Sequence, residues 1–455
     1  MARKKSYARD LTQGPILRQM LAFVFPIMLS GVLQILFNTA DTIVVGRFAG
    51  NEALAAVGSN TSLITLMTNL FIGLSIGANI ICARYIGAKE PDKVHDTVHT
   101  AVLVSILSGL FLAVVGIIGA RQFLIWMSVP DDVIDLSVVY LRIYFLGMPA
   151  MMVYNFGSAL LRSIGDTTRT LYYLVAAGIV NVVLNLILVI PLQMSVAGVA
   201  IATAVSQCIS GVLVVRCLMH EESAIHLNLR EMRVYPARLK EILMIGLPAS
   251  VQGCVFSFAN IAIQASINTF GSVLLAGNSA AASVEGFIYL PINAFYQAVM
   301  PFISQNLGAK QYHRLNRVFW SAALSVFVVG EVLGLGSILL SQPLLSIFTT
   351  DPAVIAAGQI RFNSYFAIYG LFGLMEVLVG SIRGLGYSTL PTIIYVGGIC
   401  GVRLGWLATV FQMEQYHTIQ TVFYAFPVSW FVTIPILAVC YAYAYRNTKK
   451  KAGII

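Results

Sequence analysis

Two long stretches of the chain, residues 170–215 and 242–284, contain no Asp, Glu, Lys or Arg, and a third covers 415–445. A membrane-spanning helix needs ~20 mostly apolar residues, so each of the first two stretches is long enough for a helical hairpin. Strands of a membrane barrel would instead show segments of about 10 residues with alternating polarity. With 58% hydrophobic and 10% charged residues, the chain is far more apolar than a soluble protein, where about a quarter are charged. The sequence therefore predicts an all-α polytopic membrane protein.

The apolar pattern predicts twelve transmembrane helices, and the loops between them predict the orientation. Most of the 28 Lys and Arg residues fall in the two tails and in alternate loops, whereas Arg47 and Arg121 fall in the opposite loops. Because cytoplasmic loops are enriched in Lys and Arg, both termini are predicted to be cytoplasmic, in the plasma membrane. The same distribution accounts for the net charge of +9 without a nucleic-acid partner. The predicted helices are 16–44, 54–82, 96–119, 136–160, 169–191, 196–218, 241–267, 274–302, 317–340, 354–380, 390–412 and 420–445.

The chain contains two copies of one sequence unit. Matches between the halves hold a nearly constant spacing over well-separated segments, which is improbable for unrelated helices. Each copy has six helices, an even number, so the repeats are predicted to be parallel and to leave a cleft between two lobes. The alternative is a duplicated bundle without a central cavity. The matches are Pro26, Gly31 and Asn38 with Pro248, Gly253 and Asn260, YIGAK (85–89) with NLGAK (306–310), Tyr144-Phe145 with Tyr365-Phe366, and LRSIG (161–165) with IRGLG (382–386).

The repeat and the one long polar interruption divide the chain into five parts. The interruption, EESAIHLNLREMRVYPARLKE, has mixed charge and is interpreted as a cytoplasmic linker. The predicted parts are a cytoplasmic tail (1–15), an N-terminal six-helix lobe (16–219), the linker (220–240), a C-terminal six-helix lobe (241–446) and a basic cytoplasmic tail (447–455).

Several motifs resemble those of multidrug and toxic compound extrusion (MATE) transporters. They are LFNTADTIVVGRF at 36–48, LAAVG at 54–58, GAK at the ends of the second and eighth helices, and LRSIGDTTR after the fourth. Each motif alone is weak, but their order, the twelve helices and the duplication make the set fairly specific. The resemblance covers essentially the whole chain.

Four carboxylates lie inside the predicted spans and not at their first residues, namely Asp41, Glu285, Glu331 and Glu376. An ionisable group in hydrocarbon costs at least ~2.5 kcal/mol, which makes each a functional candidate unless it lies near a membrane surface. With a rise of about 1.5 Å for each helical residue, Asp41 lies near the outer end of the first helix and Glu285 is the nearest of the four to mid-membrane. We interpret Glu331 and Glu376 as structural more than functional.

Asp41 is the acid that the second copy lacks, because the equivalent position is Ile263. From the residues alone, it is equally well a solvated carboxylate at a helix mouth. In many prokaryotic members of the family that the chain resembles, an aspartate at this place binds the coupling proton or sodium ion. The resemblance therefore implies a cation-coupling role for Asp41.

Three pairs of residues in the same lobe have helical spacing and are predicted to share one hydrogen-bonded cavity: Asn38 with Asp41, Asn181 with Asn185, and Thr203 with Gln207. The alternative is that they join helices to one another, as Asn, Gln and Thr often do in membranes. We assign Asp41, Asn38, Asn181, Asn185 and Thr203 to a cation-coupling site, and Gln207 to the substrate cavity.

The chain also departs from the family in two places. Related members often have an acid one turn after the asparagine of the fifth helix, where this chain has Asn185. With one carboxylate in place of two, the expected coupling ion shifts modestly from sodium towards a proton. Other members use a glutamate in the seventh helix, and the nearest equivalent here is Phe256.

Glu285, in SVEGFIYLPINAF, has no counterpart in the first half. A carboxylate in an apolar cleft favours cationic ligands, so Glu285 is predicted to line the substrate cavity together with Gln207. The alternative is that Arg361 or Arg403, which also fall inside spans, neutralises it.

Other reactive residues give no sign of an enzyme or of a metal site. The six cysteines lack paired spacing, and no P-loop, HExxH or CxxC motif is present. His95 and His99 have i, i+4 spacing, but the motif offers no third ligand, so zinc is not expected. No cofactor is predicted other than the coupling ion, H+ or Na+.

The combined prediction is a secondary antiporter that exports amphipathic, cationic organic compounds by alternating access between two lobes. Its expected partners are small-molecule substrates and membrane lipid, and it is expected to be a monomer that binds no nucleic acid. The alternative is a flippase for a lipid-linked saccharide, which would line its cleft with arginines for pyrophosphate. Only Arg142, Arg361 and Arg403 lie more than three residues inside the predicted spans here.

Overall fold

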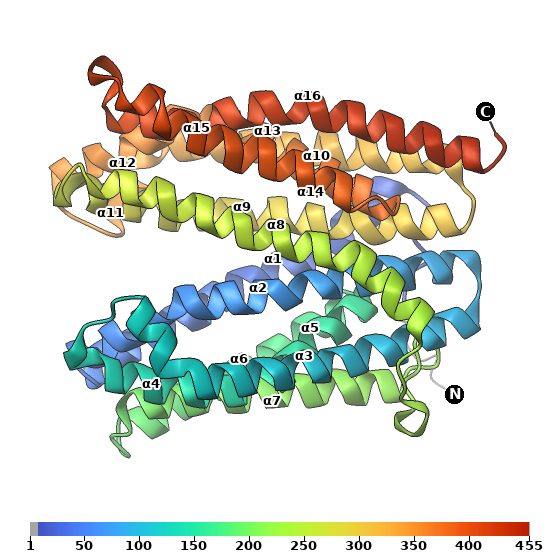
Figure 1. The fold of residues 1–455 in the computed structure, drawn as a ribbon, viewed down its shortest axis with the longest axis horizontal. Helices are drawn as coiled ribbons and strands as arrows, with labels where there is room; N and C mark the ends of the chain where they lie inside the picture. The colour runs from blue at the N-terminus through green and yellow to red at the C-terminus, as the bar shows by residue number, and fades with distance from the viewer. Residues whose placement is uncertain (1–7, 455) are drawn as a thin grey trace. The chain divides into compact units, whose positions relative to one another are not determined.

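The computed structural model describes residues 8–454 and consists of helices and their connections, with no strand in that range (Figure 1). The first seven residues of the predicted N-terminal tail, and Ile455, lie outside the described residues. Helices suit lipid because they satisfy every backbone hydrogen-bonding group within the segment. The helices are α1 (Ile16–Phe48), α2 (Asn51–Ala88), α3 (Pro91–Trp126), α4 (Asp131–Leu146), α5 (Met148–Ser163), α6 (Thr168–Val189), α7 (Ser195–Met219), α8 (Pro236–Asn268), α9 (Ser272–Gly308), α10 (Tyr312–Leu339), α11 (Ser341–Ser346), α12 (Pro352–Tyr365), α13 (Tyr369–Gly384), α14 (Thr389–Tyr395), α15 (Val402–Ala408) and α16 (Ile419–Lys451).

The predicted number of spans is confirmed, with one span broken. In the described part of the chain, eleven helices or helix runs are long and apolar enough to cross a membrane. A twelfth span forms when α4 and α5, which are bent by 47° at their junction, are counted together. Pro149 lies just after this junction and cannot donate a backbone hydrogen bond to the preceding turn, so a helix break is favoured here.

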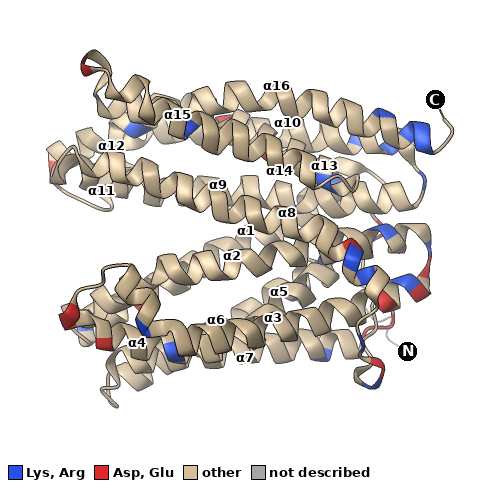
Figure 2. Cartoon of the chain, in the orientation of Figure 1, with Lys and Arg blue, Asp and Glu red and all other residues tan. Residues whose placement is uncertain are grey.

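The outer surface of the helices is apolar where a soluble protein would be polar. Leu339, Ile118 and Val439 are 83%, 77% and 71% exposed, respectively. Figure 2 shows charged residues mainly near helix ends, including the blue C-terminal end of α16, with Lys449, Lys450 and Lys451. Helix surfaces of this kind contact lipid hydrocarbon.

Two compact units share the chain, and two helices contribute to both. The first unit comprises a short stretch ending at Asp10 together with Leu29–Ser250, and the second comprises Leu11–Met28 with Val251–Ile455. In α1 and α8 the change of unit comes two residues after Pro26 and Pro248, respectively. Both helices therefore change unit at the same position of the repeat.

The backbone repeats the sequence register. Six residues have left-handed φ angles in pairs that keep the spacing of the sequence repeat, and two of the three pairs end motifs that the sequence comparison matched. Left-handed angles are uncommon and must be imposed by the local turn, especially for lysine. The pairs are Gly50 (φ 91°) with Gly271 (87°), Lys89 (58°) with Lys310 (58°), and Gly165 (80°) with Gly386 (97°).

Each unit has its own packed interior. In the first unit a buried cluster includes Leu141, Phe145 and Met152. In the second unit Phe23, from the first part of α1, packs edge-on against Phe302 of α9 with ring centres 5.7 Å apart. All six cysteines are free, as expected from their spacing.

Candidate functional site

The first unit contains a cavity of about 290 Å³, here called the first pocket. Residues of α1, α2, α4, α5, α6 and α7 line it. The lining includes both polar side chains and aromatic or aliphatic ones. The lining residues are Gln34, Phe37, Asn38, Asp41, Ile72, Tyr144, Met151, Tyr154, Asn155, Leu174, Ala177, Gly178, Asn181, Thr203, Ser206, Gln207 and Ser210.

Close approach of α1 to α6 brings Asp41 to its partners. A Cβ at Gly178 of α6 would lie 1.9 Å from the ring of Phe37, so only glycine lets α1 approach this closely. Phe37 precedes Asp41 by four residues and therefore lies on the same face of α1. Close contact at Gly178 therefore brings the face of α1 that carries Asp41 next to α6.

Asp41 belongs to a chain of hydrogen bonds through α6 to α7. Asn185 Nδ2 donates to Asp41 Oδ1 and also lies 3.5 Å from Asn181 Oδ1. Asn181 Nδ2 donates to Thr203 Oγ1 at 3.4 Å. Both asparagines are buried, and among the described residues Asp41 forms no ion pair. The structure thus brings together four of the five residues assigned to cation coupling.

The remaining predicted residues of this lobe line the pocket without joining that chain. Asn38 lies on the pocket wall, and the Nε2 of Gln207 lies 3.8 Å from Met151 Sδ. The sequence places Gln207 and Glu285 in one substrate cavity, and that shared cavity stays a prediction. Glu285 lines a different pocket, which lies within the second unit.

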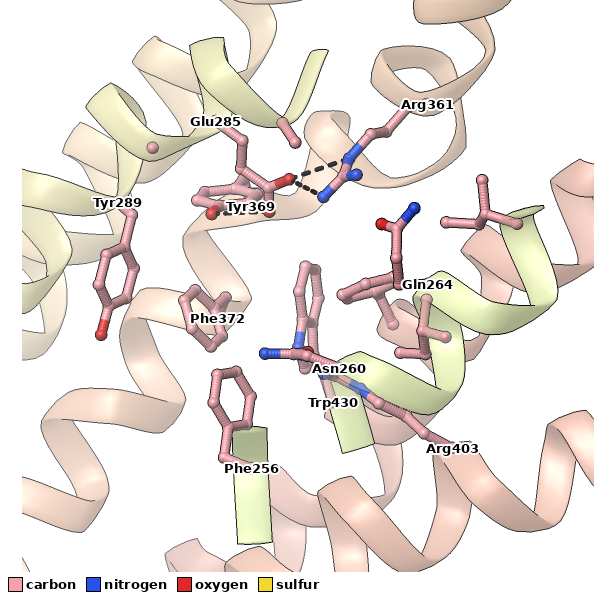
Figure 3. A pocket seen from close by; sticks show the side chains of 15 residues that line it. Phe256, Asn260, Gln264, Glu285, Tyr289, Arg361, Tyr369, Phe372, Arg403 and Trp430 are labelled. Carbon is pink, nitrogen blue, oxygen red and sulfur yellow. Dashed lines mark hydrogen bonds and ion pairs between the residues drawn. The ribbon is translucent and has the colours of Figure 1, made fainter. Parts of the chain in front are cut away.

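The second unit contains a cavity of about 330 Å³, here called the second pocket (Figure 3). Ile263, the counterpart of Asp41, and Phe256, the position compared with the seventh-helix glutamate, both line it. Asn260, the counterpart of Asn38, does so as well. The full lining is Phe256, Asn260, Ile263, Gln264, Ile267, Ala282, Glu285, Gly286, Tyr289, Arg361, Tyr369, Phe372, Arg403, Phe426 and Trp430.

Arg361 neutralises Glu285, which is the alternative considered for this acid. The Glu285 Oε2 atom lies 2.5 Å from Arg361 Nη2 and 3.0 Å from Nε (Figure 3). Tyr365 also donates to Oε2 at 2.8 Å, and Tyr369 donates to Oε1 at 3.1 Å. Arg361 Nη1 donates to Asn278 Oδ1 at 2.5 Å. Every charge of this group therefore has a partner, and Glu285 offers no free negative charge to a cationic ligand.

Arg403 has no such acid. Its side chain is 1% exposed, and its Nε donates to Ser429 Oγ at 3.2 Å. The guanidinium carbon lies 4.3 Å from the ring centre of Phe426 and 5.8 Å from that of Phe256, both favourable cation–π distances. Nη1 has no hydrogen-bond partner in the described part of the chain. A π-helical segment, Val396–Gly401, directly precedes α15, which carries Arg403, and such segments often occur at functional sites.

The other two carboxylates within spans have structural partners. Glu331 Oε1 accepts from the backbone N–H of Gly370 at 3.1 Å, near the start of α13. Glu376 is buried and accepts from the Tyr395 hydroxyl at 3.1 Å. Neither lines the second pocket. These contacts agree with the structural interpretation of both residues.

A third potential metal ligand does lie beside His95 and His99. The expectation that the two histidines lack a third ligand is therefore wrong. Glu231 from the linker comes within 4.8 Å of both rings, and its Oε2 lies 2.8 Å from His95 Nε2. That hydrogen bond holds the pKa of the Glu231 carboxyl below its usual range. His99 uses both ring nitrogens, towards the His95 carbonyl and the Asn228 backbone. Since this leaves His99 no free lone pair, the cluster fits a hydrogen-bonded junction better than a metal site.

The sequence argument missed the tyrosines and the tryptophan of the second pocket. Tyr289, Tyr369 and Trp430 lie in apolar spans rich in aromatics, where no local pattern separates a pocket residue from a packing residue. The available signal was Arg403, a cation deep in a span with no acid near it in sequence.

Comparison with known proteins identifies the family. The family model MatE matches residues 26–187 and 248–407, once in each half of the chain. A probable multidrug resistance protein of Bacillus subtilis, YoeA, is 27% identical over 440 residues, covering 94% of each chain. A FAD transporter of Shewanella oneidensis is 27% identical over 383 residues, covering 82% of this chain and 83% of that one. A solved outward-facing structure of a multidrug resistance MATE family transporter of the MOP superfamily superposes with a TM-score of 0.90 at 20% identity, covering 98% of this chain and 100% of that one.

The family match falls in both copies of the repeat and includes most of the residues that line each pocket, and the YoeA match covers 94% of the chain. Members of this family move small organic compounds across membranes and are not enzymes. The chain is therefore a member of the MatE family of multi-pass membrane transporters.

Proposed function

We propose that this protein is a secondary antiporter that exports amphipathic organic compounds in exchange for a proton, by alternating access between two lobes. Asp41 is the residue at which the ion binds. Binding of the ion at Asp41 changes the arrangement of α1 against α6, and the substrate is released outward.

The observation that carries the proposal is the environment of Asp41. This carboxylate lies in a membrane-spanning helix, lines the first pocket and has no cationic partner among the described residues. An unpaired charge in a span costs free energy, and a bound cation removes that cost. Apart from two tyrosines, Asp41 is also the only acid or base among the residues that line this pocket.

A proton suits the neighbouring residues better than a sodium ion. When Asp41 binds a proton, its new O–H needs an acceptor. Asn185 Oδ1 is buried and has no donor in the described part of the chain, so rotation of this amide supplies the acceptor. Hard metal cations take several oxygen ligands, and here only one of them would carry a charge. Sodium is thus the second candidate for the coupling ion.

The names of the relatives support export of varied organic compounds. One is named a probable multidrug resistance protein, and another is named a FAD transporter. FAD is an aromatic compound with acidic groups. The expected preference for cations rested on Glu285, which Arg361 neutralises. The flippase alternative predicts several arginines for pyrophosphate. Among the described residues that line the two pockets, Arg403 is the one arginine without an acidic partner, so this alternative gains little support.

We further propose that the protein works as a monomer in the plasma membrane, in contact with lipid and with both termini cytoplasmic. The distribution of Lys and Arg supports this orientation. Both pockets are complete within one chain, which supports a monomer as the working unit.

Purified full-length protein in liposomes tests the function. Release or uptake of ethidium, a fluorescent aromatic cation, and of pyrenebutyrate, a fluorescent aromatic anion, is followed under an imposed pH gradient or an imposed sodium gradient. We expect the pH gradient to drive movement of at least one probe, at a rate well above that of protein-free liposomes. Movement driven by sodium alone would replace the proton in the proposal, and no response to either gradient would overturn antiport.

A further inference from the structure

The second pocket contains two buried hydrogen-bond donors without an acceptor. Arg403 Nη1 and Trp430 Nε1 have no partner among the described residues, and each side chain is 1% exposed. Both residues line the same cavity. Buried donors are almost always satisfied in proteins, so two unsatisfied donors in one cavity indicate a missing acceptor.

The second pocket also has a net positive charge. Its ionisable lining residues are Glu285, Arg361 and Arg403, apart from two tyrosines. Glu285 and Arg361 form an ion pair, and the oxygens of Glu285 accept further hydrogen bonds from Tyr365 and Tyr369. Glu285 is therefore fully occupied, and the charge of Arg403 remains. A buried charge is costly unless it is paired, so the missing acceptor is expected to be negative.

Aromatic rings form much of the rest of the wall. Phe256, Phe372, Phe426 and Trp430 line the cavity, and Phe372 and Trp430 are stacked with ring centres 5.5 Å apart. The cavity volume of about 330 Å³ lies at the lower end of the range for small-molecule sites. Such a wall favours a flat ring system, while a few polar groups fix its orientation.

We propose that the second pocket binds aromatic compounds that carry an anionic group, a carboxylate or a phosphate. The anionic group accepts a charge-assisted hydrogen bond from Arg403 Nη1, and Trp430 Nε1 is a second donor within the same cavity. The ring system packs among the four aromatic side chains. Binding stands on the geometry of this pocket alone, whereas export of the bound anion rests on the proposed antiport function.

Equilibrium binding of two probes with the same ring system tests the proposal. Pyrenebutyrate carries a carboxylate, and 1-pyrenemethylammonium carries a cation on the same ring. Binding to the purified full-length protein in detergent is measured by fluorescence and calorimetry, without any ion gradient. We expect pyrenebutyrate to bind at least about tenfold more tightly, since a hydrogen bond to a charged group corresponds to factors of about ten to a hundred.

Variants assign that preference to the two donors. Arg403→Gln should weaken pyrenebutyrate binding about ten- to a hundredfold and leave cation binding unchanged or tighter, while Arg403→Lys should retain part of the preference. Trp430→Phe keeps a smaller aromatic ring, removes the donor and should cost about two- to tenfold. The matched control is Trp406→Phe, because the Trp406 indole lies outside the pocket and donates to the Thr421 carbonyl at 2.8 Å. Thermal unfolding and gel filtration establish that each variant is folded.

The outcomes separate this proposal from antiport. Equal binding of both probes by the unmodified protein, or unchanged pyrenebutyrate binding in folded Arg403→Gln, would show that water alone satisfies the two donors. If Arg403→Gln does not fold, the proposal is tested by Arg403→Lys and Trp430→Phe. Unchanged pyrenebutyrate binding in both of these variants would overturn it. Anion-selective binding without gradient-driven transport would support the anion pocket and overturn the antiport function. Gradient-driven transport without anion-selective binding would support antiport and overturn the anion pocket.

Discussion

The two pockets occupy corresponding places in the sequence repeat but have opposite electrostatic character. In the first, Asp41 is the only ionisable lining residue apart from two tyrosines and has neutral amide and hydroxyl neighbours. In the second, Ile263 stands at the equivalent position, Glu285 is paired with Arg361, and Arg403 leaves a positive charge. One duplicated helix bundle therefore contains an acidic cavity and a basic one.

The difference shows which parts of a duplicated unit are free to change. The left-handed turn positions, such as Lys89 and Lys310, are the same in both copies because they set how one helix follows the next. Pocket residues do not determine how one helix follows the next. The backbone therefore tolerates Asp41 in one copy and Ile263 at the equivalent position of the other. An acidic cavity and a basic cavity can thus form on two copies of one backbone arrangement.

Breaking the ion pair of the second pocket should give the largest effect. Glu285→Gln leaves Arg361 without its acid, and removal of one partner of a buried pair costs about 3–5 kcal/mol. We expect a corresponding loss in the free energy of unfolding, measured by thermal or denaturant unfolding in detergent. The double variant Glu285→Gln with Arg361→Met should be more stable than Glu285→Gln alone, because it buries no unpaired charge. Equal stability of Glu285→Gln and the unmodified protein would mean that solvent already screens this pair.

Removing the acid of the first pocket should give the next largest effect, on transport and not on stability. Asp41→Asn keeps the size of the side chain and removes its ability to bind a proton. Gradient-driven transport in liposomes should fall by about a hundredfold, since coupling free energies of ~1–3 kcal/mol correspond to factors of about 5–150. The protein should remain folded and inserted.

Asp135→Asn is the matched control for this variant. Asp135 lies in the same unit, but its side chain is 79% exposed and pairs with Arg121 at 3.0 Å. This change should leave transport unaltered. Unchanged transport in Asp41→Asn would return Asp41 to the role of a solvated carboxylate at a helix end.

Much of the fold was predictable from the sequence, because hydrophobicity and repetition act over long segments. The twelve spans and the duplication follow from the apolar runs and from the constant spacing between matched motifs. The bend between α4 and α5 follows from Pro149. The assignment of the first parts of α1 and α8 to the opposite units did not follow, since it depends on packing between segments far apart in sequence.

The first pocket was more predictable than the second. Asp41, Asn181 and Asn185 are polar residues in apolar helices, where each stands out and helical spacing places them on common faces. In the second unit, the sequence offered two arginines as partners for Glu285, and only the three-dimensional arrangement assigns Arg361 to it. The charge left on Arg403 follows from that choice, and its one sequence signal is that no acid lies near Arg403 in the same span.

A second acid beside Asp41 would sharpen the contrast between the first pocket and the second. Asn185→Asp places a carboxylate beside Asp41, where related transporters often have an acid. Two carboxylates and nearby oxygen atoms favour a metal cation. We expect transport to become about tenfold more responsive to an imposed sodium gradient, as typical coupling energies allow. Asn155→Asp is the control, because Asn155 lines the same pocket but donates to the Met151 carbonyl. An equal sodium response in both variants would reflect general negative charge and not a site at Asp41.

Copying the acid of the first pocket into the second should give a smaller effect that tests the comparison most directly. Ile263 is buried and lines the second pocket, so Ile263→Asp changes the net charge of the lining from positive to neutral. Pyrenebutyrate affinity should fall by about fivefold, the equivalent of an ion pair worth ~1 kcal/mol, because the new carboxylate competes with the ligand for Arg403. Ile263→Asn has nearly the same size and no charge, and it should retain most of the affinity. If both variants lose affinity equally, the loss comes from the shape of the wall, and the polarity of the two pockets does not depend on this position of the repeat.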